Sequence, residues 1–205
     1  MNFFQLIISG GPILIPIILC SVITLTIFIE RLMYFNSIRA DVQLLKDRVF
    51  DLISLNKLKE AYAICEGSSS PSAKIIKAGL IKFSASRIEI KESMKNAGDL
   101  LIPEFKINLI FLSSITYISP LLGLLGTATG MAVIFRTIEV KTKALQPFTT
   151  GDLAFGVWSA ILTTVAGMLV GILAFIAYNY CEYRITQFIN EMDRSAVELM
   201  EKHNV

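Results

Sequence analysis

The amino-acid sequence predicts an all-α membrane protein with three transmembrane helices and a helical cytoplasmic domain. Of its 205 residues, 54% are hydrophobic and the mean hydropathy is +0.62, which is too apolar for an ordinary soluble domain. Three stretches carry no charged side chain, namely residues 1–29, 107–135 and 153–181. Each could form a helix of about 43 Å, whereas bilayer hydrocarbon is about 30 Å thick. The alternative is three helices buried in a soluble core, but the rest of the chain is too small to cover them.

The first span is predicted at residues 13–33, after a short N-terminal segment at residues 1–12. A signal peptide is the alternative, but the stretch lacks the positively charged start and the small-residue cleavage site of such a peptide. It is followed instead by "ERLMYF", residues 30–35. A charged pair beside aromatic rings is typical of a membrane interface, so Glu30 and Arg31 are the predicted interface anchor.

The distribution of lysine and arginine predicts the orientation. Thirteen of the nineteen lie in residues 31–106, three in residues 136–143 and three after Glu182. The positive-inside rule therefore places the long segment in the cytoplasm, although the three charges at residues 136–143 would then lie outside. The predicted order is a periplasmic N-terminus (1–12), a first span (13–33), a helical cytoplasmic domain (34–106), a second span (107–135), a periplasmic loop (136–152), a third span (153–181) and a cytoplasmic C-terminal helix (182–205).

The cytoplasmic domain is predicted to be entirely helical. Apolar residues recur at helical spacing over residues 42–55, and a short helix is expected from Asn56 as its N-cap to Gly67. The turn after it leads to Pro71, which suits the first position of a helix over residues 71–99. Basic and acidic residues alternate throughout, which does not favour a nucleic-acid partner.

The sequence offers no catalytic or metal-binding cluster. Its single histidine, His203, lies at the C-terminal end, and Cys20, Cys65 and Cys181 are far apart. No glycine-rich loop is followed by a phosphate-binding lysine. We therefore expect no metal, no cofactor and no enzymatic activity.

The second and third spans each carry one face of small and polar residues. On helical spacing the two faces are, respectively, Thr116, Pro120, Gly123, Thr127 and Gly130, and Gly156, Ser159, Thr163, Gly167 and Gly171, with Thr164 beside the second. Thr127 lies about 13 Å from Arg136 and Thr164 about 18 Å from Asp152 at helical rise, so their hydroxyls are expected at similar depth.

Two interpretations of these faces are open. In one, a single chain cannot bury both faces, so they line a shared interior surface, either a water-filled path or a seat for another helix. In the other, the glycines permit tight packing and the threonines bond to carbonyls of their own helix. Neither face carries a charge. An ionisable group for ion transfer would therefore come from a partner.

Four motifs, in order, resemble the ExbB/TolQ/MotA family of ion-driven motor proteins, most closely its ExbB/TolQ branch. They are "GGPILIPIILCSVITLTIFIERLMYF", "KLKEAYAICEGSSSPSAKIIKAGL", "PLLGLLGTATGM" and "AILTTVAGMLVGILAFIAYN". The resemblance implies a homopentameric ring in the bacterial inner membrane, with the second and third spans around a central pore. It further implies a dimer of a single-span ExbD/TolR-like partner in that pore, whose aspartate exchanges protons, and a TonB- or TolA-like protein that receives the motion.

Carried over by motif position, the pore threonines are Thr127 and Thr164. The predicted ion pathway consists of Thr127, Ser159, Thr163 and Thr164. The predicted packing residues of the pore are Gly123, Gly126, Gly130, Gly167 and Gly171.

The chain departs from the branch at two positions. Ser159 stands where a glutamate is usual, and Leu173 where a proline is frequent. The missing carboxylate leaves the choice between H⁺ and Na⁺ open. The alternatives to an ExbB/TolQ-like channel subunit are a MotA-like stator, a gliding-type motility protein, and a passive membrane scaffold or receptor subunit.

Overall fold

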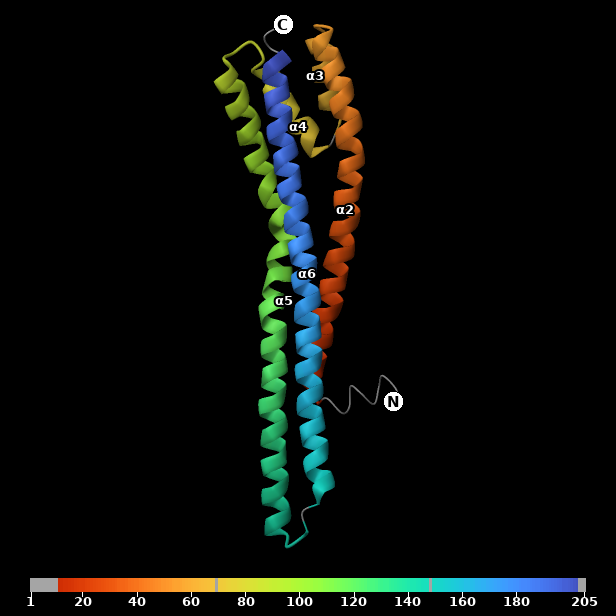
Figure 1. Ribbon diagram of the computed structural model, residues 1–205, viewed down its shortest axis with the longest axis vertical. Helices are drawn as coiled ribbons and strands as arrows, with labels where there is room; N and C mark the ends of the chain where they lie inside the picture. Colours follow the sequence, from red (N-terminus) through yellow and green to blue (C-terminus); the bar gives the residue numbers. More distant parts are fainter. Residues whose placement is uncertain (1–10, 69, 148, 203–205) are drawn as a thin grey trace. The chain divides into compact units, whose positions relative to one another are not determined.

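The computed structural model describes residues 11–68, 70–147 and 149–202, and within these ranges it is all-helical, as predicted. The helices in chain order are α2 (Leu14–Ser54), α3 (Leu58–Gly67), α4 (Pro71–Ile81), α5 (Arg87–Lys143) and α6 (Thr150–Lys202) (Figure 1). Three helical stretches are long and apolar enough to cross a membrane: Leu14–Ile38, Arg87–Lys143 and Leu153–Glu201. The prediction of three apolar helices is therefore confirmed.

The three long helices continue well beyond the charge-free stretches. α2 runs to Ser54 and α6 to Lys202 without a break, because residues 34–54 and 182–202 contain neither glycine nor proline. α5 continues through Gly98 and the exposed Pro103. At an exposed position, water can satisfy the carbonyl that a proline leaves without its N–H partner.

Two details of the predicted helices are wrong. Asn56 does not cap α3. It has a left-handed backbone (φ 59°) and closes the C-terminus of α2 by donating its N–H to the Ile53 carbonyl at 3.0 Å. The single helix predicted over residues 71–99 is broken between Ile81 and Arg87. By contrast, α3 ends at Gly67 and α4 begins at Pro71, as predicted.

The break before α5 has a local cause that sequence reasoning missed. Ser86 and Glu89 form a variant of the capping box, in which the Glu89 N–H donates to the Ser86 hydroxyl oxygen at 3.3 Å and the Ser86 hydroxyl, rather than its backbone N–H, donates to Glu89 Oε1 at 3.1 Å. The sequence signal is "SRIE", serine followed three residues later by glutamate. This box starts a new helix instead of extending the previous one.

The chain divides into two compact units. The first, here called the membrane unit, comprises residues 1–28 and 110–179, and the second, the charged unit, comprises residues 29–109 and 180–205. In the membrane unit, a small apolar core joins all three helices through Ile17 of α2, Ile115 of α5, and Val170 and Ala174 of α6. Large apolar side chains also cover much of its outer surface, which suits a hydrocarbon environment.

The charged unit has its own core. The rings of Phe105 and Phe188 pack edge to face with centroids 5.0 Å apart, and Tyr34 lies 6.0 Å from Phe105. The α3–α4 hairpin packs on the same unit through Gly79. A Cβ at Gly79 would lie 2.6 Å from Leu199 Cδ2 of α6, so this glycine lets α4 approach α6 closely.

Candidate functional site

α5 and α6 approach each other through glycine within the membrane unit. A Cβ at Gly167 would lie 2.6 Å from the Ser119 carbonyl oxygen and 2.9 Å from the Gly123 Cα, so backbone meets backbone there. Further along the contact, Gly126 faces the Thr163 side chain and Gly130 faces Ala160. Such close approach is the usual role of glycine between membrane helices.

All five glycines predicted to pack the pore lie in this contact between two helices of one chain. The fifth, Gly171, faces Pro120 of α5. The expectation that a single chain cannot bury the two small-residue faces is therefore wrong, because the faces bury each other to a large extent. The glycine pattern remains compatible with a ring, but by itself it no longer requires one.

The Thr164 hydroxyl connects the two helices. It donates to the Gly123 carbonyl of α5 at 3.1 Å and also lies 3.2 Å from the Ala160 carbonyl of its own helix. In an α-helix, the Gly123 carbonyl is also the acceptor for the Thr127 N–H. The Thr164 hydroxyl and the Thr127 backbone N–H thus meet at one backbone carbonyl, so the two threonines lie at the same level of the helix pair.

The other predicted pathway residues differ in their surroundings. Thr127 is half-buried and donates its hydroxyl to the Leu124 carbonyl of its own helix at 2.6 Å. Thr163 is only 1% exposed, donates to the Ala160 carbonyl at 2.9 Å and packs against Gly126. Ser159 is half-buried, and its hydroxyl oxygen would lie 3.9 Å from a Cβ at Gly11, just before the start of α2.

Two buried hydroxyls of the membrane unit were missed by sequence reasoning. Ser119 is 0% exposed and Thr24 is also buried, and neither hydroxyl has a hydrogen-bond partner within the described residues. The sequence signal at Ser119 is the proline that follows it. Because Pro120 has no N–H, the Thr116 carbonyl lacks its usual hydrogen-bond donor within the helix. A polar backbone group therefore lies at the same level of α5 as the Ser119 hydroxyl.

The predicted interface anchor belongs to the charged unit. Glu30 is exposed and its Oε2 accepts a hydrogen bond from Asn108 Nδ2 of α5 at 2.8 Å. Arg31 is buried, with its guanidinium 5.5 Å from the centre of the Tyr34 ring. Asn108, which the sequence analysis did not single out, therefore ties the end of the first span to α5.

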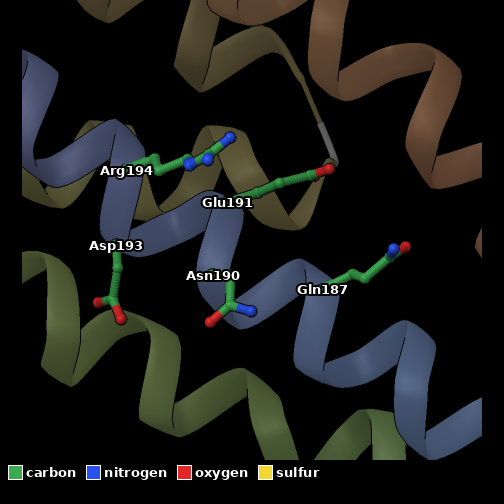
Figure 2. Close-up of a pocket in the computed structure, with 5 residues that line it drawn as sticks. All are labelled: Gln187, Asn190, Glu191, Asp193 and Arg194. Atoms are coloured by element: carbon green, nitrogen blue, oxygen red, sulfur yellow. The ribbon is translucent and has the colours of Figure 1, made fainter.

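A polar hollow in the charged unit is lined by five residues of α6, shown in Figure 2: Gln187, Asn190, Glu191, Asp193 and Arg194. Asp193 and Asn190 are directed toward α5, while Glu191 and Arg194 extend away from it. Acidic and basic groups are mixed in this hollow, and it includes none of the residues predicted from the sequence. Across the described residues, no group of three or more His, Cys, Asp or Glu side chains is placed to hold a metal ion.

These observations define a class, a polytopic helical membrane protein whose charge-free helix pair carries aligned glycines and hydroxyls. The chain belongs to the MotA/TolQ/ExbB proton channel family, whose model matches residues 68–194, more than half of the sequence. The resemblance expected from the four motifs is thereby confirmed. With three candidate spans, the chain is a multi-pass inner-membrane protein of a family of channel and transport proteins.

Individual relatives are similar over most of their length. The putative biopolymer transport protein ExbB-like 3 of Synechocystis sp. is 28% identical over 83% of this chain and 80% of its own. The Tol-Pal system protein TolQ of Haemophilus influenzae is 25% identical over 90% of this chain and 86% of its own. The biopolymer transport protein exbB1 of Vibrio cholerae is 26% identical over 78% of this chain and 70% of its own. ExbB-type and TolQ-type relatives thus match at similar identity.

Proposed function

We propose that this protein is the channel-forming subunit of an ion-driven inner-membrane motor, of the ExbB/TolQ kind. Family membership is the observation that carries the proposal. The meeting of Thr164 and Thr127 at the Gly123 carbonyl adds a structural reason, because it concentrates polar groups within a charge-free helix pair. In the proposed assembly, the chain forms a homopentamer around an ExbD/TolR-like dimer and drives a TonB- or TolA-like protein that acts at the outer membrane.

The proposed topology has an outer N-terminus and an inner C-terminus. It follows from the concentration of lysine and arginine in residues 31–106. In this topology the α5–α6 connection faces the periplasm and the charged unit faces the cytoplasm. The span and loop boundaries predicted from the sequence are part of this proposal.

The proposed mechanism depends on a carboxylate supplied by the partner. Residues 107–135 and 153–181 contain no titratable acid or base that could carry a proton, apart from tyrosine and cysteine. Hydroxyls of Thr127 and Thr164 would solvate the partner's ionised carboxylate without fixing it, as a lysine or arginine would. The membrane potential contributes about 2.3 kcal/mol per charge per 100 mV to each cycle.

Not every predicted pathway residue has the same role in this proposal. Thr163 is buried between α5 and α6, so we assign it to helix packing. Ser159 is half-buried and stands where the branch usually has glutamate. Because the ring then lacks its own carboxylate, Na⁺ is a second candidate ion beside H⁺.

Two other functions remain as alternatives. A MotA-like or gliding-type motor would share the ion pathway but drive surface motility. A passive scaffold would share the fold but carry no ion flux. Flux measurements separate the scaffold from both motors, and the identity of the driven partner separates the motors from each other.

The test is partner-dependent ion flux in liposomes, measured under an H⁺ gradient and under a Na⁺ gradient. Thr127→Val keeps the side-chain shape and removes only a hydroxyl bonded to its own helix. We expect flux to fall about tenfold, because the partner carboxyl would lose solvation and its pKa would rise by about one unit. Thr129→Val is the matched control, since that hydroxyl also bonds only to its own helix, at the Gly126 carbonyl.

Flux in Thr127→Val equal to that of the control and of the parent protein would contradict the assigned pathway. Absence of partner-dependent flux in the parent protein itself would favour the scaffold. Ser159→Glu is the companion variant, and it tests the ion. Restoring the usual carboxylate should shift the ratio of H⁺ to Na⁺ flux, and an unchanged ratio would show that this position does not select the ion.

A further inference from the structure

The end of α4 and the start of α5 carry positive charges that the described chain does not neutralise. Residues 74–95 contain six basic and only two acidic side chains. Lys77 is paired with Glu66 at 2.9 Å. The described residues supply no ion-pair partner for the four exposed cations that follow, here called the basic surface: Lys82, Arg87, Lys91 and Lys95.

Two large apolar side chains lie among these charges. Ile81 ends α4 and Ile88 lies in the first turn of α5, and their exposed fractions are 63% and 71%. Ile88 precedes the charge-free stretch at residues 107–135 by about 28 Å at helical rise, so lipid does not cover it. Exposed apolar side chains between unpaired cations indicate a protein partner with acidic and apolar groups.

The outer face of α6 offers such groups. The polar hollow of Figure 2 adjoins a second hollow, and the two share Asp193 and Arg194. Each has a volume of about 490 Å³, which is large enough to admit side chains of a partner. The second hollow is lined by Lys46, Asp193, Arg194, Val197, Glu198 and Glu201.

The two hollows together are acidic. Lys46 and Glu198 neutralise each other in an ion pair of 2.7 Å. Three further acids then remain with a single base, Arg194, and all three are exposed: Glu191, Asp193 and Glu201. Val197, which is 47% exposed, adds an apolar side chain. This pair of hollows is here called the acidic hollow.

The basic surface and the acidic hollow lie at the same level of the charged unit. A Cβ at Gly79 would lie 2.6 Å from Leu199 Cδ2 and 2.7 Å from Met94 Sδ, so α4, α5 and α6 meet there. Lys95 follows Met94 directly, and Glu201 lies two residues after Leu199. Within the described part of the chain, however, no ion pair joins the two surfaces.

A second copy of the chain can present each surface to the other. Copies of one membrane protein are inserted at the same depth and in the same orientation, so equivalent levels of neighbouring charged units come side by side. Two different, complementary surfaces on one chain form a head-to-tail contact. Such contacts close into a ring when the rotation between copies permits it.

We propose that the basic surface of one chain docks on the acidic hollow of the next copy, with Ile88 packed against Val197. The charges set the register of the two charged units, and the apolar side chains exclude water between them. This inference rests on the proposed function, because it requires the ring. It can nevertheless fail while the ring stands, since the membrane units of neighbouring chains could hold the ring alone.

The first test is cross-linking between two differently tagged full-length chains that are expressed together. One chain carries Ile88→Cys and the other Val197→Cys, and membranes are treated with a short bis-maleimide. We expect a cross-link between the two tags. Lys59→Cys in place of Ile88→Cys is the matched control, because Lys59 is exposed on α3 outside both surfaces. Ile88→Cys should not cross-link to itself, because the contact is head-to-tail.

The second test reverses the charges in the same cross-linking pair. Lys91→Glu with Lys95→Glu on the Ile88→Cys chain should lower the cross-linked fraction about tenfold, because attractive contacts become repulsive. Glu191→Lys with Glu201→Lys on the Val197→Cys chain should restore it to within about twofold of the starting pair. High salt should weaken the cross-link of the starting pair, since exposed charges are screened.

Four results would overturn the proposal. A ring in native mass spectrometry whose Ile88–Val197 cross-link does not exceed the Lys59 control would remove this contact and leave the proposed function intact. Efficient cross-linking of Ile88→Cys to itself would indicate a two-fold contact instead. A loss that the reversed partner does not restore would show that these charges do not pair. A parent protein that forms no ring at all would contradict both this contact and the proposed assembly.

Discussion

At the scale of single residues, the threonines of the membrane unit divide by where their hydroxyls bond. Thr127 and Thr163 donate within their own helices, whereas Thr164 donates across to α5. Sequence spacing places all three on helix faces but cannot distinguish these bonds, because the acceptor of Thr164 is distant in the chain. Valine at position 164 would remove an interhelical hydrogen bond as well as a hydroxyl of the proposed ion pathway. Thr127 is therefore the cleaner position for testing the ion pathway.

Cys65 provides a pH-dependent prediction in the charged unit. Burial raises the pKa of its thiol from the usual 9.0 to about 11, and the nearby positive charge of Lys77 opposes this only in part. Because the pKa is raised, the folded protein keeps the thiol proton at pH values where the unfolded chain would lose it. The contribution of Cys65 to the stability of the folded state is thus present below pH 9 and is lost as the pH rises toward 11.

We expect alkylation of Cys65 by N-ethylmaleimide near pH 8 to be about 100-fold slower in the folded protein than in the unfolded chain, because about two pKa units separate the thiolate fractions. The measurement is mass spectrometry of the Cys65 peptide across pH. Folded protein should begin to react only at clearly alkaline pH. Equal rates near pH 8 would show that this thiol is neither buried nor shifted.

At the scale of elements, the contact of α5 with α6 depends on the absence of side chains. Gly167→Ala would place a methyl group 2.6 Å from the Ser119 carbonyl oxygen, and backbone cannot yield as a flexible side chain can. We expect a loss of stability of about 1–3 kcal/mol, typical of overpacking. Thermal unfolding in detergent, followed by circular dichroism, measures the effect.

Gly151→Ala is the control on the same helix. A Cβ there would lie 3.7 Å from Thr149 Oγ1, an ordinary van der Waals contact. This variant should unfold at or slightly above the temperature of the parent, since alanine favours a helix more than glycine does. If both variants unfold at the parent's temperature, α5 and α6 do not pack as closely as the structure shows.

At the scale of the whole molecule, the proposed homopentamer now depends on family membership more than on the glycine faces, which one chain largely buries by itself. Purified in mild detergent, the protein should give a closed ring in native mass spectrometry. Rings of this kind should persist on dilution to micromolar concentration. Monomers or dimers as the only species would count against the assembly.

The proposed topology is tested by labelling intact cells with an impermeant thiol reagent. Lys59→Cys and Gln146→Cys both introduce a thiol at an exposed position. In the proposed orientation, position 146 is labelled and position 59 is labelled only after the membrane is permeabilised. The parent chain, with its own cysteines, provides the background, and the opposite labelling pattern would reverse the topology.

The extent of each helix shows where sequence reasoning stopped short. Charge-free stretches mark where a chain can be buried in hydrocarbon, but they do not mark helix ends, and α2, α5 and α6 all continue into charged sequence. Helix ends depend on local signals that were partly misread. Asn56 closes α2 in a left-handed conformation, and the Ser86–Glu89 box opens α5. Both signals involve hydrogen bonds that composition alone does not reveal.

The sequence alone was sufficient for the fold class, the three apolar helices and the family, because hydropathy, charge and short motifs are local properties of a chain. The close glycine contact of α5 with α6, the bond from Thr164 to Gly123 and the burial of Arg31 emerged only from the tertiary structure. These features join residues tens of positions apart or depend on burial. The contribution of a glycine, a hydroxyl or a guanidinium to the free energy of folding depends on the atoms packed against it. A linear pattern shows which side chains share a face of a helix, but not what covers that face.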